Sequence, residues 1–334
     1  MATLKDIAGE VGVSIRTVTR ALSGNGYVRE DIRDRIREVA GRLGYRPDPL
    51  AQSLRLGRSR QLVVVSHSVD ELHMAKIASL EQRVRPAGFA VSVLMARASE
   101  LGTDSLVDEL RSRRPAGVAV IATLEIDVTP LVAPLYAAGI PCVPIDSRSA
   151  YPSVVIDRPA GVAEAVEHLV SRGRRRIVYV GPSGSTSRTR GVRQALERHG
   201  RETVTFDPGP DLRRDRLASG LLERHPDVDA VQAFSDEWAL ELLAGLHARG
   251  VRVPDDVALV GFDDRWAAAH SWPSLTTVAQ PGERIGAAVA ELLVGEDRPR
   301  LEALCGAPAP DGDGSSVDEP TRSIPTELVV RGSA

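Results

Sequence analysis

Residues 3–22, TLKDIAGEVGVSIRTVTRAL, predict two short helices separated by a tight turn. The apolar residues of the first helix recur with the spacing of a single helix face: Leu4, Ile7, Ala8 and Val11. Gly12 then ends this helix. The inward side of the second helix carries Val18, Ala21 and Leu22. Two short helices joined by a glycine-containing turn form a helix–turn–helix, so this stretch predicts a DNA-binding unit.

Polar residues stand where both helices need caps. Thr3 and Asp6 have the spacing of a capping box, and Ser14 can cap the second helix. The second helix of a helix–turn–helix enters the major groove, where Arg reads guanine and hydroxyl groups suit phosphates. We therefore expect Ile15, Arg16 and Arg20 to contact bases. Four hydroxyl residues are expected to hold phosphates: Thr3, Ser14, Thr17 and Thr19. The alternative is an ordinary helical hairpin with a solvated basic face.

A third amphipathic helix follows and ends at Gly44; its apolar face is Ile32, Ile36, Val39, Ala40 and Leu43. At this point the chain resembles the lactose/galactose repressor (LacI/GalR) family of transcription regulators. The motifs TLKDIA, GVS, TVTRAL and LGYRP, with Val28 and the Ala51–Leu54 pair, fall in the family's order and spacing. The resemblance runs in register from Thr3 to Leu54 and continues more loosely to the C-terminus.

Residues 47–60 combine two prolines with a basic, leucine-containing segment. Asp48 can cap a helix that begins at Pro49, but two turns are too short to be stable alone. A plain basic linker is one interpretation. The family resemblance implies instead a hinge helix that orders on DNA, with Leu54 wedged into the minor groove.

Charge is distributed unevenly along the chain. Residues 1–60 hold 12 Lys and Arg against 7 Asp and Glu, whereas the remaining residues hold 30 against 38. A basic N-terminal module on an acidic body is typical of a protein whose N-terminal end faces DNA. The two cysteines are too few for a disulfide framework, and we find no signal peptide or long apolar run, so we expect a cytoplasmic protein without a membrane segment.

After Gln61 strands and helices alternate, which favours parallel sheets with right-handed crossovers. Apolar runs predict strands at 62–66, 89–95, 117–122, 142–146, 176–181, 229–234 and 257–263, with helices at 160–172, 187–198 and 238–249. The segment 157–160 is a candidate crossing between two lobes, and residues 296–324 have the composition of a disordered insertion. The resemblance implies two similar subdomains of the periplasmic-binding-protein type with a ligand cleft between them. The expected fold is an all-α helix–turn–helix domain plus a two-lobed α/β, periplasmic-binding-protein-like (type I) effector domain.

Polar residues follow the ends of several predicted strands. Parallel sheets bind ligands at the carboxyl ends of their strands, so we expect these residues to contact an effector. The candidates are His67, Glu71, His73, Asp146, Arg188, Ser235 and Asp263. Asp146 and Asp263 accept hydrogen bonds and Arg188 donates them, a combination that suits the hydroxyls of a sugar or polyol. In the family, Arg188 stands where a ligand-binding arginine is placed.

Other chemistries are less well supported. His67, Glu71 and His73 suggest a metal site, but no further ligand cluster accompanies them, so we expect no metal and no cofactor. The glycine-rich segment 181–191 lacks the Gly-Lys-Ser/Thr ending of a nucleotide-binding loop. No catalytic constellation is present, so the sequence does not predict an enzyme.

The sequence therefore predicts a DNA-binding transcription regulator, most simply a repressor, with three parts: residues 1–46, the helix–turn–helix domain; 47–60, the hinge helix and linker; and 61–334, the effector-binding and dimerisation domain. The expected partners are a double-stranded DNA operator with an inverted repeat, a small effector such as a sugar, and a second copy of the chain in a homodimer or tetramer. The alternatives are a purine- or nucleoside-responsive co-repressor type and a non-regulatory sugar-binding protein.

Overall fold

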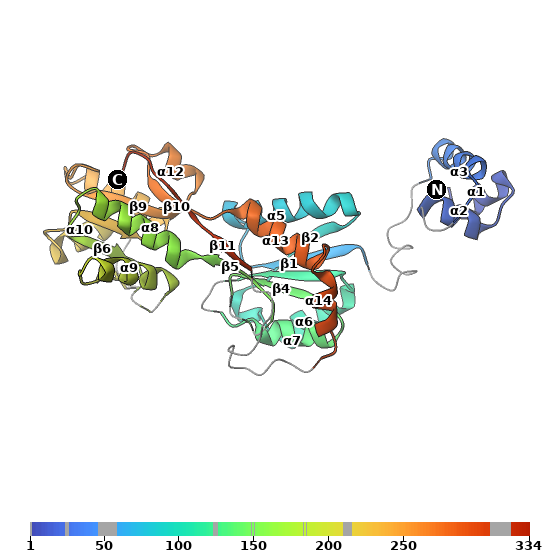
Figure 1. Ribbon diagram of the computed structural model, residues 1–334, viewed down its shortest axis with the longest axis horizontal. Helices are drawn as coiled ribbons and strands as arrows, with labels where there is room; N and C mark the ends of the chain where they lie inside the picture. Colours follow the sequence, from blue (N-terminus) through green and yellow to red (C-terminus); the bar gives the residue numbers. More distant parts are fainter. Residues whose placement is uncertain are drawn as a thin grey trace. The chain divides into compact units, whose positions relative to one another are not determined.

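The computed structural model describes residues 2–23, 27–45, 59–122, 126–147, 149, 151–182, 184, 186–209, 216–307 and 322–334. By its internal contacts the chain divides into two compact units, Met1–Arg60 and Gln61–Ala334 (Figure 1). Each unit is described separately below.

The first unit is the predicted three-helix domain, with α1 (Leu4–Val11), α2 (Ile15–Ser23) and α3 (Glu30–Arg42). The capping box of α1 is confirmed, because the Thr3 hydroxyl accepts from the Asp6 N–H and the Asp6 carboxylate accepts from the Thr3 N–H. Gly12 ends α1 at φ 75°, a left-handed conformation that favours glycine. The three helices share one apolar core: Ile7, Ala8, Val18, Ala21, Val28, Ile36, Val39 and Ala40.

The second unit contains two six-stranded sheets, each with helices on both faces, which we call the first and second lobes. The strands of the first lobe are β1 (Gln61–Ser66), β2 (Ala90–Met95), β3 (Gly117–Ile121), β4 (Cys142–Ile145), β5 (Val154–Asp157) and β11 (Arg322–Pro325). They lie in the order β11-β5-β4-β3-β1-β2, and all their pairings are parallel. Its helices are α5 (Glu71–Val84), α6 (Asp104–Arg113), α7 (Thr129–Ala137), α13 (Gly282–Leu293) and α14 (Arg298–Leu304), with short 3₁₀ turns η1 (Arg85–Ala87) and η2 (Ala98–Glu100). Figure 1 shows α5 and α13 on one face of the sheet and α6 and α7 on the other.

The second lobe repeats this arrangement. Its strands are β6 (Ile177–Val180), β7 (Val204–Phe206), β8 (Ala230–Ala233), β9 (Ala258–Asp263), β10 (Thr276–Ala279) and β12 (Glu327–Val329). They lie in the order β12-β10-β9-β8-β6-β7, in which only the β10–β12 pairing is antiparallel. Its helices are α8 (Arg158–Ser171), α9 (Ser187–Arg198), α10 (Leu217–Arg224), α11 (Asp236–His247) and α12 (Trp266–His270). Helices α8 and α9 pack on one face of the sheet, and α10 and α11 pack on the other.

The chain crosses between the lobes at three places. It passes from β5 into α8 at residues 157–158, from β10 into α13 at 280–281, and from β11 into β12 at Thr326. The crossing segments touch, since the Thr326 hydroxyl donates to the Asp157 carbonyl at 3.1 Å. A Cβ atom on Gly161 would lie 2.0 Å from the Thr326 Oγ1 atom, so only glycine allows this close approach. The crossing predicted at 157–160 is confirmed.

The predicted strands of the second unit are present with ends within one residue of the prediction. The prediction of a disordered insertion over residues 296–324 is wrong at both ends of that range, because Arg298–Leu304 form α14 and Arg322–Pro325 form β11. Leu301 is fully buried in the first lobe, so apolar packing overrides the polar composition around it. Residues 308–321 lie outside the described residues. The boundary predicted at residues 46–47 and the predicted hinge helix that begins at Pro49 also lie outside the described residues.

Candidate functional site

The second helix of the first unit presents one apolar and one polar face. Val18 and Ala21 are buried against α1 and α3, whereas Arg16 and Arg20 are exposed. Ile15 is 46% exposed, which is unusual for a large aliphatic side chain with a core beside it. An exposed apolar residue next to two arginines fits a surface that contacts thymine methyl groups and guanine edges.

The hydroxyl residues around this helix have structural partners as well. The Ser14 hydroxyl accepts from the Thr17 N–H at 3.1 Å, which caps α2. Thr17 is half-buried and lies 2.9 Å from the same hydroxyl, and Thr19 is half-buried too. Thr3 is exposed and engaged in the cap of α1. Leu54, the predicted wedge, lies outside the described residues.

The second unit holds a cavity of about 210 Å³ that is lined by residues of both lobes. The first lobe contributes His67, Asp70, Leu72, His73, Lys76, Ile121, Ala122 and Asp146. The second lobe contributes Thr186, Ser187, Arg188, Phe234, Asp263 and Arg265. Two further lining residues, Arg158 and Gln280, lie at the crossings between the lobes. The predicted effector residues His67, His73, Asp146, Arg188 and Asp263 are therefore brought together. Glu71 and Ser235 do not line the cavity.

Arg188 supplies one of the two buried guanidinium Nε donors of the cavity that lack a hydrogen-bond partner among the described residues; Arg265 supplies the other. Its side chain is only 12% exposed, and its guanidinium lies between the rings of Phe234 and Phe262, 4.2 and 4.3 Å from their centroids. The Nε atom is buried and has no hydrogen-bond partner among the described residues. Its single carboxylate contact joins Nη2 to the Oδ1 atom of Asp263 at 3.5 Å. Burial lowers the pKa of Arg188, the expected result for a charge held away from water.

The two predicted carboxylates sit on unusual backbone at the ends of their strands. Asp146 has φ 58° and Asp263 has φ 123°, values that L-residues seldom adopt. Backbone strain of this kind collects at functional sites, where the surrounding structure maintains it. Asp263 accepts a hydrogen bond from the Gln280 Nε2 atom at 2.6 Å, and burial raises its pKa.

Asp146 is committed to a partner within the cavity wall. Both of its carboxylate oxygens contact the guanidinium of Arg158, and Oδ1 also accepts from the Ile156 N–H at 3.4 Å. Asp146 directly follows β4 and Arg158 begins α8, so this buried pair fixes the end of the strand against the first crossing. Asp146 remains at the cavity surface, but its charge is compensated by Arg158.

The first-lobe wall is organised by Asp70, the N-cap of α5. Its Oδ1 atom accepts from the Leu72 and His73 N–H groups at 3.0 Å and lies 2.7 Å from the His73 Nδ1 atom. These hydrogen bonds hold the pKa of Asp70 well below its usual range, although burial opposes them. Burial lowers the pKa of His73, although the hydrogen bond between its ring and Asp70 opposes this effect. The rings of His67 and His73 meet edge to face, 4.9 Å apart.

Contacts across the cleft join the two lobes near the cavity mouth. The Trp266 N–H donates to the Glu71 carboxylate at 2.9 Å, and the Arg265 Nη2 atom lies 3.7 Å from Asp70. Arg265 also pairs with Glu237 at 3.5 Å. Glu71 was predicted to contact the effector, and here it bridges the lobes instead of lining the cavity.

The loop that carries Arg265 is supported by Asp236, a fully buried carboxylate. Asp236 accepts from the Thr277 hydroxyl at 2.5 Å and from the Arg265 N–H at 2.7 Å. Burial, together with the nearby carboxylates, raises the pKa of Asp236 to about 6. Ser235, the neighbouring predicted effector residue, instead caps α11 by accepting from the Trp238 N–H at 3.5 Å.

Several cavity residues were missed by the sequence reasoning. Lys76 lies in the middle of a helix, where no local signal distinguishes it from a solvated lysine. Arg158 and Gln280 do follow strands, so the strand-end argument could have found them. Arg265 comes two residues after Asp263 and was open to the same argument.

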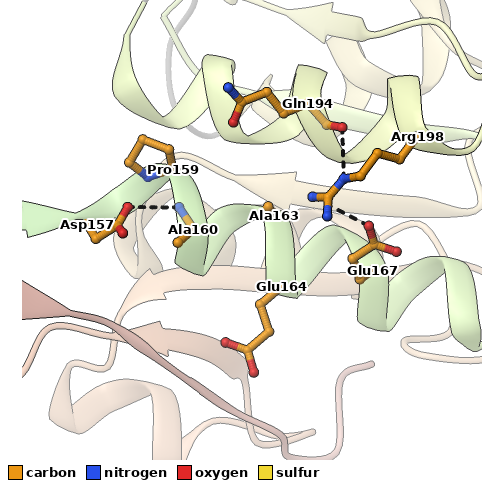
Figure 2. Close-up of a pocket in the computed structure, with 8 residues that line it drawn as sticks. All are labelled: Asp157, Pro159, Ala160, Ala163, Glu164, Glu167, Gln194 and Arg198. Carbon is orange, nitrogen blue, oxygen red and sulfur yellow. Dashed lines mark hydrogen bonds and ion pairs between the residues drawn. The ribbon is translucent and has the colours of Figure 1, made fainter.

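A second hollow of about 440 Å³ lies between α8 and α9 on the second lobe (Figure 2). Three of its charged groups have partners: the Arg198 Nε atom donates to the Gln194 carbonyl at 3.1 Å, and Arg198 lies 3.5 Å from Glu167. Asp157 accepts from the Ala160 N–H at 3.1 Å. It lacks the buried, unsatisfied donors found in the cavity between the lobes, so the cavity between the lobes is the better candidate for a ligand site.

Within the described ranges, no group of three or more His, Cys, Asp or Glu residues is placed to hold a metal ion. No helix of the described part of the chain is long and apolar enough to span a lipid bilayer.

Both units match known protein families. Residues 3–48 match the family described as bacterial regulatory proteins, lacI family. Residues 166–334 match the periplasmic binding protein-like domain.

Relatives of similar length extend these matches over most of the chain. The HTH-type transcriptional regulator CelR of Thermobifida fusca is 33% identical over 87% of this chain and 91% of its own length. The HTH-type transcriptional regulator GntR of Pseudomonas aeruginosa is 30% identical over 87% of this chain and 88% of its own length. A solved complex described as transcriptional regulator CelR–cellobiose superimposes with a TM-score of 0.66 at 28% identity, over 100% of both chains. The lac repressor dimer bound to operator shares the fold, with a TM-score of 0.80 at 22% identity over 99% of this chain and 98% of that chain. The chain belongs to the lacI family of bacterial regulatory proteins, and it is a DNA-binding transcriptional regulator rather than an enzyme.

Proposed function

We propose that the protein is a cytoplasmic repressor that binds an inverted-repeat DNA operator as a homodimer and responds to a sugar or polyol held between its two lobes. The observation that carries the effector site is Arg188, whose buried guanidinium has an unpaired Nε atom at a cavity lined by Asp263. A buried donor without a partner is costly, and a ligand oxygen would satisfy it.

The chemistry of the cavity favours a polyhydroxylated ligand. Asp263 can only accept hydrogen bonds when ionised and Arg188 can only donate them, whereas a hydroxyl does both. A purine would need an aromatic face to stack on. Phe234 lines the cavity, but the guanidinium of Arg188 already covers its ring. One relative supports the same class, since the CelR structure is described as a complex with cellobiose.

Coupling to DNA follows from the contacts across the cleft. Glu71 with Trp266 and Asp70 with Arg265 join the lobes beside the cavity. A ligand that strengthens one arrangement of the lobes shifts the population toward it, typically with a coupling energy of about 1–3 kcal/mol. The same shift would change the spacing of the two hinge segments in a dimer and hence the affinity for the operator.

The test begins with selection of an operator from a random DNA pool by the full-length protein. Operator affinity is then measured by fluorescence anisotropy, with and without a panel of sugars, polyols and nucleosides. We expect a sugar or polyol to change operator affinity at least fivefold in wild type, and we expect Asp263→Asn to lose this response while retaining operator binding without effector. A response to purines alone would contradict the ligand class, and a full response in the variant would contradict the site.

A further inference from the structure

Each arginine of the cavity has a carboxylate partner. Arg158 holds both oxygens of Asp146, Arg188 contacts Asp263 at 3.5 Å, and Arg265 pairs with Asp70 at 3.7 Å. The charges of Asp146 and Asp263 are therefore compensated within the cavity wall. The cavity carries four cationic side chains against three carboxylates.

The remaining cation is Lys76, which projects from α5 into the cavity wall. The residue is only 6% exposed, and the hydrogen bond that its Nζ atom makes is to the Gln280 Oε1 atom at 3.3 Å. No carboxylate among the described residues forms an ion pair with it. Asp146 and Asp263 act on it only from a distance, and Arg158 opposes them. A buried ammonium without an anion is costly, because desolvation is not offset by a counter-charge.

Lys76 also belongs to the polar network that surrounds the predicted ligand. Gln280 accepts from Lys76 through Oε1 and donates to Asp263 through Nε2 at 2.6 Å. Asp263 in turn contacts Arg188. A ligand that reaches Arg188 and Asp263 with its hydroxyls is therefore adjacent, through a single glutamine, to an unpaired ammonium.

We propose that the effector is a sugar acid, an aldonic or uronic acid, whose carboxylate pairs with Lys76 while its hydroxyls contact Arg188 and Asp263. The inference rests on the proposed function and specifies its ligand class. The cavity volume of about 210 Å³ lies below the roughly 300–1,000 Å³ that accommodates drug-sized ligands, so a single sugar ring or an open six-carbon chain fits the space. Lys76 is then the residue that distinguishes an acidic sugar from its neutral counterpart.

Isothermal titration calorimetry of the full-length protein with matched pairs tests this assignment: glucuronate against glucose, galacturonate against galactose, and gluconate against sorbitol. At least one acid should bind tenfold or more tightly than its neutral partner. Lys76→Met should weaken that acid at least tenfold and leave the affinity for the neutral partner within threefold, because only the charged contact is lost. Arg83→Met removes a charge from an exposed position of the same helix and should change neither affinity.

The remaining outcomes separate the two proposals. Equal or tighter binding of the neutral sugars, or equal weakening of acid and neutral sugar by Lys76→Met, would overturn the sugar-acid assignment and leave a sugar-controlled regulator standing. Failure of every compound to bind wild-type protein would overturn both. Should the melting temperature of ligand-free Lys76→Met fall, Lys76→Gln, which keeps a polar group beside Gln280, provides the same comparison.

Discussion

Replacement of Arg188 by methionine should separate ligand binding from folding. Methionine keeps a straight, apolar side chain between Phe234 and Phe262 and removes the guanidinium. Two cation–π contacts, each worth about 0.5–2 kcal/mol, are lost. Against this, a buried unpaired N–H group, which costs about 1–3 kcal/mol, disappears as well. Asp263 loses its contact with Arg188 but keeps its hydrogen bond from Gln280 and the neighbouring Arg265 guanidinium, whose Nε atom lies 3.9 Å away.

Because these terms largely cancel, the melting temperature of the ligand-free variant should stay within about 3 °C of wild type. Effector binding should suffer much more. A hydrogen bond to a charged donor contributes about 1.5–3 kcal/mol, which corresponds to a loss of about 13- to 160-fold in affinity. Operator binding without effector should be unchanged, because α2 and its arginines belong to the other unit.

The assays are differential scanning fluorimetry, calorimetry with the identified effector, and anisotropy with the operator. Arg190→Met is the matched control, since Arg190 lies two residues away on the same helix and is exposed. A melting temperature lowered by more than about 8 °C, with effector affinity changed less than threefold, would show that Arg188 serves the core and would refute the reasoning.

Three further predictions concern other parts of the chain. Arg20→Ala should weaken binding to the selected operator by about 1–3 kcal/mol and relax its sequence preference; equal losses on operator and random DNA would assign Arg20 to phosphate. Leu54→Ala should reduce operator affinity, should reduce DNA bending in a gel-shift bending assay, and should leave effector affinity unchanged. An unaltered bend angle would show that Leu54 does not insert into the minor groove. The pKa of Asp236 is about 6 in the folded protein, against an ordinary 3.8. Its carboxyl group therefore favours folding fully while it is protonated, below about pH 4, and this part of the free energy of unfolding is lost as the pH rises through 6. Asp236→Asn should therefore gain up to about 3 kcal/mol relative to wild type between pH 4 and pH 7 in urea unfolding, and parallel pH profiles of the two proteins would contradict this.

The DNA-binding unit could be predicted almost completely because its signals are local. Thr3, Gly12 and Ser14 act within four residues of their own position, through caps and a turn. The long strands of the second unit were also predictable from their apolar runs. The strands β5 and β11 were missed, because β5 holds a run of only three apolar residues and β11 has the largely polar sequence RSIP. They pair with each other although they are distant in sequence.

The candidate effector site was predictable only where its residues follow a strand. Asp146, Arg188 and Asp263 come directly after strands or at the helix that follows one, and all three line the cavity. The partnership of Asp146 with Arg158 and the burial of Lys76 beside Gln280 depend on how the lobes fold together. Glu71 shows the same limit, since its bond to Trp266 joins residues 195 positions apart.

The three crossings between the lobes also determine how this protein can be recombined. Neither lobe is a continuous piece of chain, because α13, α14 and β11 return to the first lobe after most of the second has been completed. A gene fusion that exchanged residues 61–157 alone would combine the first-lobe strands of one parent with the edge strand β11 and the helix α13 of the other, so that the packing of α13 on α5 would be mismatched. A chimeric regulator with a new operator specificity should therefore be joined near residue 60, with the whole of residues 61–334 kept from one parent.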